Sequence, residues 1–154
     1  MRVRWLWFLV VVLVAVSVVP VLAARPLHTA HGAFRAEFFF AGRALEFQVC
    51  FSVQDRGNAE EDHGSLSIRM FNWEPDTSAV VLRATDVWDV RPDGEAIAFK
   101  ADVIVVTGGF PFPTGHMTFV AFDDGVDDRL MIGSSLGSIM LGDFLQGGIR
   151  IRSF

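Results

Sequence analysis

The 154-residue chain has no tyrosine, a single cysteine and a single lysine, and no segment of useful length with the apolar spacing of an amphipathic helix. A lone cysteine excludes an internal disulfide. The missing helical period argues against helical bundles and leaves the all-β classes. At this length, one domain with one hydrophobic core is expected.

Basic residues are also fewer than acidic ones. The chain carries 13 basic and 18 acidic residues, and no basic stripe interleaved with aromatic residues runs along it. An acidic chain repels phosphate backbones. This composition argues against nucleic acid as a partner.

The first 24 residues have the pattern of a secretory signal peptide. A short basic start precedes a continuous apolar run over 5–19, and small residues follow at Ala23 and Ala24. That order is typical of a cleaved signal. The alternative is an uncleaved anchor, since 5–24 is barely long enough for the roughly 20 apolar residues that span a bilayer.

Cleavage would leave an acidic protein outside the cytoplasm. Two arginines would leave with the signal, so 11 basic residues would face 18 acidic ones, a net charge of −7. We expect a secreted or periplasmic location and no membrane span in the mature chain. Residues 25–32 are expected to form a flexible N-terminus, and 33–154 one all-β domain.

Most of the remaining chain alternates apolar and polar residues with a period of two. Leu66, Ile68 and Met70, for example, alternate with Ser67 and Arg69. Such alternation is typical of strands with one face packed inward and the other toward water. Strands are predicted over 33–40, 43–54, 64–72, 79–91, 95–107, 116–123, 129–135, 138–142 and 147–153.

Turn signals separate these strands at spacings of about ten residues. Asp93-Gly94 is a strong hairpin signal, because a type I′ turn needs the positive φ that Asp and Gly tolerate. Segment 55–64 is an acidic loop, and 108–115 is a Gly/Pro loop. The pattern predicts a single antiparallel β-sandwich of eight or nine strands, with a small β-barrel as the alternative. In a barrel, the first and last strands are hydrogen-bonded to each other.

Four stretches together resemble a family of bacterial secreted β-domains of the post-COAP type. They are FQVCFSVQDRGNAEEDHGSLSIRM (47–70), ATDVWDVRPDGEAIAFKA (84–101), HMTFVAFDDGVDDRLMI (116–132) and LGDFLQGGIRIR (141–152), about 100 residues in all. The chain departs from that family at the turn 123–128, where the family reads more like D-G-G-E-P-G. The resemblance implies an extracytoplasmic, non-catalytic domain, and it carries over no catalytic residues.

The stretch FDDGVDDRLMI, Phe122 to Ile132, is the densest cluster of carboxylates. We interpret Asp123–Asp128 as a hairpin turn in which Gly125 supplies positive φ. A calcium loop is the alternative, although only Asp123 and Asp127 occupy the alternate positions that such loops use. A catalytic carboxylate pair is disfavoured, since adjacent aspartates in an exposed turn keep ordinary pKa values. The acidic loop Asp55–Asp62 is likewise interpreted as solvated first and as a weak cation site second.

Two short segments resemble the sequence motifs of hydrolases only in part. GSSLG fits G-x-S-x-G around Ser135, but no histidine follows it and few residues remain for the partners of a nucleophile elbow. DTSA at 76–79 lacks the glycine of the aspartic protease motif. The four histidines, His28, His31, His63 and His116, show no zinc-ligand spacing and are interpreted as solvated.

Cys50 and several phenylalanines are the remaining candidates for functional residues. Cys50 falls on the more polar face of its strand, and the choice lies between an inert thiol and a dimer link. Phe38, Phe39 and Phe40 are consecutive and must use both strand faces. Phe110 and Phe112 in the Gly/Pro loop are interpreted as covering the end of the sandwich, or else as a ligand mouth.

No catalytic, cofactor-binding or metal-ligating residue is assigned. We expect an exported non-catalytic β-domain with a structural, adhesion or interaction role toward a protein or envelope partner. The alternative is a small β-barrel that binds or isomerises an apolar ligand in a Phe-lined cavity. A secreted hydrolase is disfavoured by the failed motifs.

Overall fold

The computed structural model describes residues 27–40, 42–71, 79–108 and 114–154, and these residues form nine strands and no helix. The strands are β1 (His28–Phe40), β2 (Arg43–Asp55), β3 (His63–Phe71), β4 (Val80–Asp93), β5 (Ala96–Thr107), β6 (Gly115–Phe122), β7 (Arg129–Ser134), β8 (Gly137–Leu141) and β9 (Gln146–Ser153). The all-β prediction with nine antiparallel strands is confirmed. Each predicted strand is present, and most bounds shift by only one or two residues.

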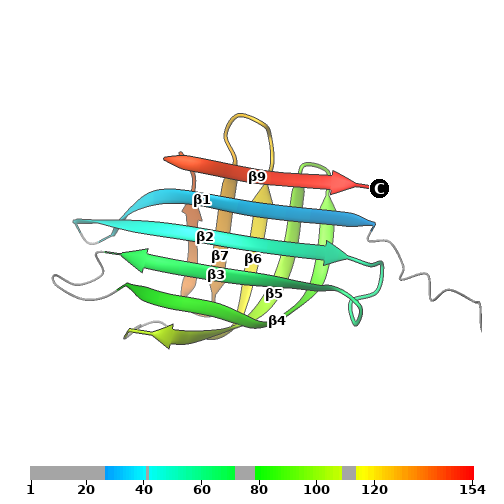
Figure 1. Ribbon diagram of the computed structural model, residues 1–154, viewed down its shortest axis with the longest axis horizontal. Coiled ribbons are helices and arrows are strands. Elements are labelled where there is room, and N and C mark those ends of the chain that lie inside the picture. Colours follow the sequence, from blue (N-terminus) through cyan, green and yellow to red (C-terminus); the bar gives the residue numbers. More distant parts are fainter. Residues whose placement is uncertain (1–26, 41, 72–78, 109–113) are drawn as a thin grey trace, which may run out of the picture.

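All nine strands belong to one sheet that curls over on itself. The order is β8-β7-β6-β5-β4-β3-β2-β1-β9, so a meander of eight strands is followed by a last strand that returns to pair with β1. Figure 1 shows β9, β1, β2 and β3 side by side across the front, with β5, β6 and β7 crossing steeply behind them. The two layers of the expected sandwich are therefore two halves of one sheet.

The sheet forms a half-barrel. The first and last strands pair, as expected of a barrel, with His28 opposite Ser153 and Arg35 opposite Gln146. Within the described residues, however, the edge strands β8 and β9 do not pair with each other. The curl therefore leaves a seam between the two edges.

β4 is the corner at which the sheet turns. Its ladder to β5 shifts register three times, between Val81 and Leu82, between Ala84 and Asp86, and between Trp88 and Arg91. Bulges of this kind bend a strand and increase its local twist, which lets one strand serve two layers that cross at a steep angle. Asp89, at φ 54°, lies inside the last irregularity.

Asp89 holds this corner with two ion pairs. Its carboxylate lies 2.6 Å from Nε of Arg91 and 2.7 Å from Nζ of Lys100. The hydrogen bond from Lys100, followed by that from Arg91, lowers the pKa of Asp89 below its ordinary value.

The core fills the inside of the curl, and its mostly aliphatic side chains surround a cluster of aromatic rings. Phe99 and Phe119 are fully buried and stacked, with centroids 5.1 Å apart, and Phe51 lies 5.6 Å from Phe99. These rings come from β2, β5 and β6, so they join the two layers across the interior. Burial of one such side chain contributes about 1.5–3 kcal/mol.

The N-terminal prediction needs one correction. β1 begins at His28, so residues 28–32 lie in the sheet and do not form part of a flexible segment. Thr29 and Ala30 are buried, and the strand pairs with β2 on one side and β9 on the other. Pairing on both sides outweighs the polar composition that suggested a loose tail. Residues 1–26 lie outside the described residues, and the signal peptide stays a prediction.

Gly147 permits β9 to lie against β1, and its replacement tests that contact. A Cβ at Gly147 would lie 1.9 Å from the carbonyl oxygen of Ala33, and its φ of +87° is strained for any L-residue. Gly147→Ala is expected to lower the free energy of unfolding by about 3 kcal/mol or more. Urea denaturation followed by tryptophan fluorescence measures it.

Gly94→Ala is the matched control, with a positive φ of +62° and no atom within 4 Å of the added Cβ. It should cost only about 1 kcal/mol, the backbone strain alone. Equal losses in the two variants would contradict a close contact between β9 and β1.

Candidate functional site

The aspartate-rich turn joins β6 to β7 and lies against the outer edge of β9. Asp123 Oδ2 accepts a hydrogen bond of 2.7 Å from the backbone N–H of Ile151, and Asp128 Oδ2 accepts one of 2.6 Å from the N–H of Ile149. Both N–H groups belong to β9, whose other edge is paired with β1. Two side chains thus bind an edge that would otherwise expose unpaired donors. We call this pair of contacts the aspartate latch.

The sequence around the latch fits its geometry. A Cβ at position 148 would lie 2.8 Å from Asp128 Oδ2, so glycine lets the carboxylate reach the strand edge. The other oxygen of Asp128 is buried with no hydrogen-bond partner among the described residues. The desolvation of that oxygen offsets part of the stabilisation from the bond to Ile149.

Asp124 shapes the turn between the two latch residues. Its Oδ1 accepts backbone hydrogen bonds from Val126 at 3.0 Å and from Asp127 at 2.5 Å. The bonds from Asp127 and Val126 lower the pKa of the Asp124 carboxyl below its ordinary value. Gly125 has a φ of +78°, which agrees with the predicted turn. Three carboxylates of the cluster thus bind backbone N–H groups. Within the described ranges, no three His, Cys, Asp or Glu side chains group as metal ligands.

The acidic loop after β2 is less solvated than its composition suggested. Asp55 and Asp62 are buried, with 6% and 8% of their surfaces exposed. Asp55 binds the His28 ring at 2.8 Å and the N–H of Gly57 at 2.7 Å. Asp62 accepts backbone bonds from Arg56 at 2.9 Å and from Val90 at 2.8 Å. The interpretation of this loop as solvated is wrong at its two ends, where each carboxylate is buried and accepts hydrogen bonds.

The histidines are not brought together. His28 and His31 are three apart on a strand and so lie on opposite faces of β1. His63 Nδ1 donates a hydrogen bond of 3.2 Å to the Glu61 carbonyl, and His116 lies 2.6 Å from Asp102 with its ring against Trp88. His28 instead pairs with a buried aspartate, so its interpretation as solvated holds only in part.

Of the two hydrolase-like motifs and the Gly/Pro loop, only the motif around Ser135 lies wholly within the described residues. Ser135 lies in the turn between β7 and β8, where no helix follows in the described part of the chain. The strand–turn–helix of a nucleophile elbow is therefore not formed at this position. Residues 76–78 of DTSA and residues 109–113, with Phe110 and Phe112, lie outside the described residues.

Cys50 is exposed on the outer face of β2, as the alternation predicted for its polar face. Both interpretations of this cysteine, an inert thiol and a dimer link, stay predictions. Phe38–Phe40 use both faces as expected, with Phe38 half-buried at 6.5 Å, edge-on, from Phe47, and Phe39 largely exposed.

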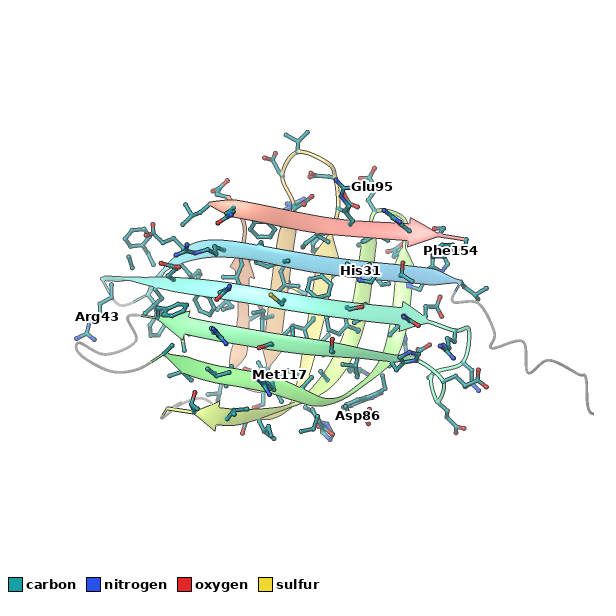
Figure 2. The ribbon with its side chains drawn as sticks, in the orientation of Figure 1. His31, Arg43, Asp86, Glu95, Met117 and Phe154 are labelled. Atoms are coloured by element: carbon teal, nitrogen blue, oxygen red, sulfur yellow. The ribbon has the colours of Figure 1, made fainter. Side chains whose placement is uncertain are left out.

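An apolar pocket of about 260 Å³ opens inside the half-barrel. It lies at the end where β1 turns into β2 and β7 turns into β8, and Figure 2 shows the side chains that fill the neighbouring interior. Its walls are aromatic and aliphatic: Phe38, Phe40, Leu45, Phe47, Ile68, Met70, Leu82, Met117, Ile132, Leu136 and Ile139 line it. Two serines supply the polar side chains of the lining, Ser134 and Ser138. Ser134 already donates a hydrogen bond to the Gly137 carbonyl.

Comparison with protein-family models, curated proteins and solved structures finds no match for this chain. The resemblance to post-COAP-type domains therefore stays an expectation from the sequence. Within the residues that the structure describes, none forms an apolar helix of the length that a bilayer crossing requires.

The latch can be tested by truncating each aspartate. Asp123→Ala and Asp128→Ala each leave a backbone donor of β9 unpaired, and each is expected to destabilise the protein by about 1–3 kcal/mol. Asp127→Ala is the matched control, since no hydrogen bond to its carboxylate forms among the described residues, and it should change stability by less than about 0.5 kcal/mol. Thermal and urea unfolding measure the differences. An Asp127 variant as damaged as the other two would contradict the latch.

The lowered pKa of Asp124 predicts that its contribution to the stability of the fold depends on pH. A carboxyl whose pKa is depressed in the folded state stabilises the fold above its unfolded pKa of about 3.9, and the contribution disappears as pH falls through the folded pKa. The parent protein should therefore melt above Asp124→Ala at pH 6, and the gap should narrow below about pH 4. A gap that stays constant down to pH 2 would contradict the role of the ionised carboxylate.

Proposed function

We propose that this chain is an exported, non-catalytic β-domain that acts by binding, and that its inner pocket takes a small apolar ligand. The observation that carries the proposal is the pocket lining, which is almost wholly aromatic and aliphatic. Ligand pockets are typically apolar with few polar groups, at volumes of about 300–1,000 Å³. A pocket of about 260 Å³ lies just below this range and suits a short alkyl chain or a small ring.

Binding is favoured over isomerisation by the same lining. General acid–base chemistry needs a titratable side chain within hydrogen-bond reach of the substrate. The described lining of the pocket holds no His, Asp, Glu, Lys, Cys or Arg. A ligand in this pocket would be held by dispersion and desolvation, and the domain would act as a carrier or as an interaction module for an apolar group.

Leu136 at the pocket mouth offers a test. This side chain is 69% exposed in the turn between β7 and β8, so its replacement by aspartate is tolerable for folding but places a charge beside an apolar ligand. Binding of 1-decanol, followed by calorimetry, is expected to weaken at least about tenfold in Leu136→Asp, because the bound ligand would displace water from the new carboxylate.

The matched control is Leu145→Asp, which adds the same charge at a side chain 62% exposed and outside the pocket lining. It should bind decanol like the parent. Absence of decanol binding in the parent protein, or equal losses in both variants, would refute the pocket as a ligand site. Native mass spectrometry of the purified protein would report an apolar molecule carried from the cell.

A further inference from the structure

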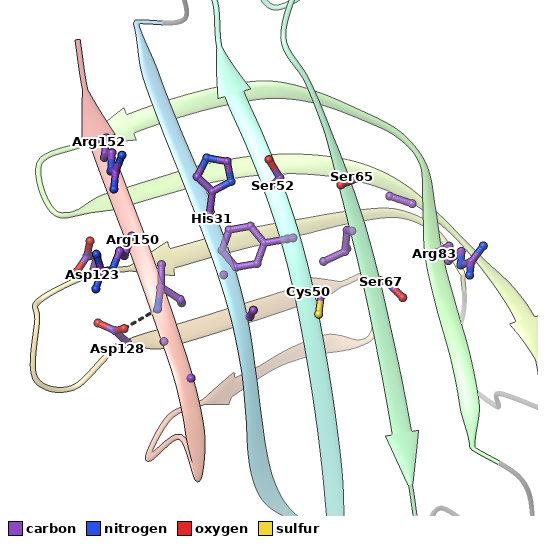
Figure 3. A pocket seen from close by; sticks show the side chains of 18 of the residues that line it. His31, Cys50, Ser52, Ser65, Ser67, Arg83, Asp123, Asp128, Arg150 and Arg152 are labelled. Carbon is purple, nitrogen blue, oxygen red and sulfur yellow. Dashed lines mark hydrogen bonds between the residues drawn. The ribbon is translucent and has the colours of Figure 1, made fainter.

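The outer face of the sheet carries a second and larger hollow, independent of the inner pocket. It covers about 1,240 Å³ over β9, β1, β2, β3 and the start of β4. Figure 3 shows its side chains, with Arg150 and Arg152 on β9, His31 on β1 and Arg83 on β4. We call this surface the arginine–serine trough.

The strand register explains why the face is hollow. One row across the sheet reads Gly148, Ala33, Cys50, Ser67 and Arg83, each opposite the next in the neighbouring strand. The adjacent row reads Arg150, His31, Ser52 and Ser65. Side chains in the middle of both rows are small, while the arginines stand at the outer strands. The floor is therefore low and polar, and the two sides are basic.

The arginines of this face are available for an external partner. In the described part of the chain, Arg83, Arg150 and Arg152 have neither an ion pair nor a hydrogen bond, and the same holds for Arg69, which follows Ser67 on β3 by two residues. The floor hydroxyls of Ser52, Ser65 and Ser67 are equally without partners there. This concentration of unpaired positive charge is unusual in a chain whose formal net charge is −5.

At the β9 end of the trough, the acidic side chains already bind groups of the protein itself. Asp123 and Asp128 border it beside β9, and each binds a backbone N–H in the aspartate latch. Further along the face, Glu46 pairs with Arg35. The guanidinium groups of Arg83, Arg150 and Arg152, together with the floor hydroxyls, thus offer unused hydrogen-bonding capacity to a partner.

We propose that the arginine–serine trough binds an acidic oligosaccharide, with carboxylates at the arginines and sugar hydroxyls on the serine floor. A guanidinium fork matches a carboxylate with two parallel hydrogen bonds, and a serine hydroxyl both donates to and accepts from a sugar hydroxyl. Four strand spacings of about 4.8 Å separate β9 from β4, about 19 Å in all. One small anion cannot bridge that width, whereas a chain with repeated acidic groups can.

Other polyanions fit this face less well. Single-stranded nucleic acid is held by stacking of its bases on aromatic side chains, and the outward side chains of the trough include no aromatic ring besides His31. An acidic peptide brings its own backbone donors and acceptors, which need partners. The backbone of β1, β2 and β3 is already used on both sides by strand pairing. Sugar hydroxyls, by contrast, find partners in the serine hydroxyls of the floor.

The test combines binding with a chemical footprint at Cys50. The chain has no other cysteine, and Cys50 is exposed in the middle of the floor, so N-ethylmaleimide labels one site inside the trough. Oligogalacturonate is expected to bind the purified protein in calorimetry and to slow labelling of Cys50 by at least about fivefold at saturation. Neutral dextran should do neither, and salt should weaken binding, since the contacts are charge pairs near solvent.

Arginine substitutions distinguish a specific binding site from non-specific attraction between the protein and a polyanion. Arg83→Ala combined with Arg150→Ala removes one arginine from each side and is expected to weaken oligogalacturonate binding at least about tenfold. The matched control is Arg91→Ala combined with Arg129→Ala, which removes two exposed arginines that pair with Asp89 and Asp124 outside the trough. The control should bind like the parent, and thermal melts establish that both double variants fold.

Several outcomes would overturn the proposal. Absence of oligogalacturonate binding, unchanged labelling of Cys50 at saturation, or equal weakening in the two double variants would each do so. Tighter binding of oligo-dT or poly-glutamate than of oligogalacturonate would assign the trough to another class of partner. These arginines do not line the inner pocket, so decanol binding should be the same in the parent and in both double variants, and failure here would not bear on the inner pocket.

Discussion

The half-barrel depends on the contact between two aspartate side chains and the outer edge of β9. A curled antiparallel sheet has two edges, and a barrel removes both by pairing them. Here Asp123 and Asp128 accept the outward N–H groups of Ile151 and Ile149. The end of the β6–β7 hairpin thereby holds the edge of the opposite layer. Two charge-assisted hydrogen bonds replace a ladder between strands.

Further contacts along the seam support the latch. The ring of Phe144 stacks on Phe34 at 3.7 Å, and the N–H of Leu145 bonds the Arg35 carbonyl at 2.8 Å. Both contacts place the segment between β8 and β9 against β1. Once β9 is fixed, the two layers enclose Phe99 and Phe119, and the apolar pocket opens at one end of this interior. The protection of the β9 edge, the packing of the core and the opening of the apolar pocket therefore all depend on how β9 is held.

The two faces of the same sheet offer two different chemistries. Inward residues are large and apolar, and they leave a small apolar pocket near the β1–β2 and β7–β8 turns. Outward residues on β9, β1, β2 and β3 are small at the centre and basic at the sides. Because alternate residues of a strand point to opposite faces, one strand such as β2 supplies Phe47 to the pocket and Cys50 to the trough. A binding domain could thus use both faces independently.

The sequence by itself determined the class and the strands. Alternation around Ile68 and the glycine at 94 are local signals, because a strand needs one apolar face and a tight hairpin needs positive φ. The predicted Asp93-Gly94 turn is shifted by one residue, since Asp93 pairs with Ala96 and the turn consists of Gly94 and Glu95. The same local logic placed Cys50 on the polar face. It failed at His28 to Gly32, where β2 and β9 pair with residues that lack a strong pattern of their own.

Only the tertiary structure decided what the polar residues do. The turn around Gly125 was readable from local propensity, but the partners of Asp123 and Asp128 lie 28 and 21 residues away on β9. Likewise, Arg83 and Arg150 share one surface because five strands lie in register, a relation that no short stretch of sequence contains. Strand propensity acts between neighbours along the chain, whereas edge protection and surface charge arise from the pairing order of the sheet.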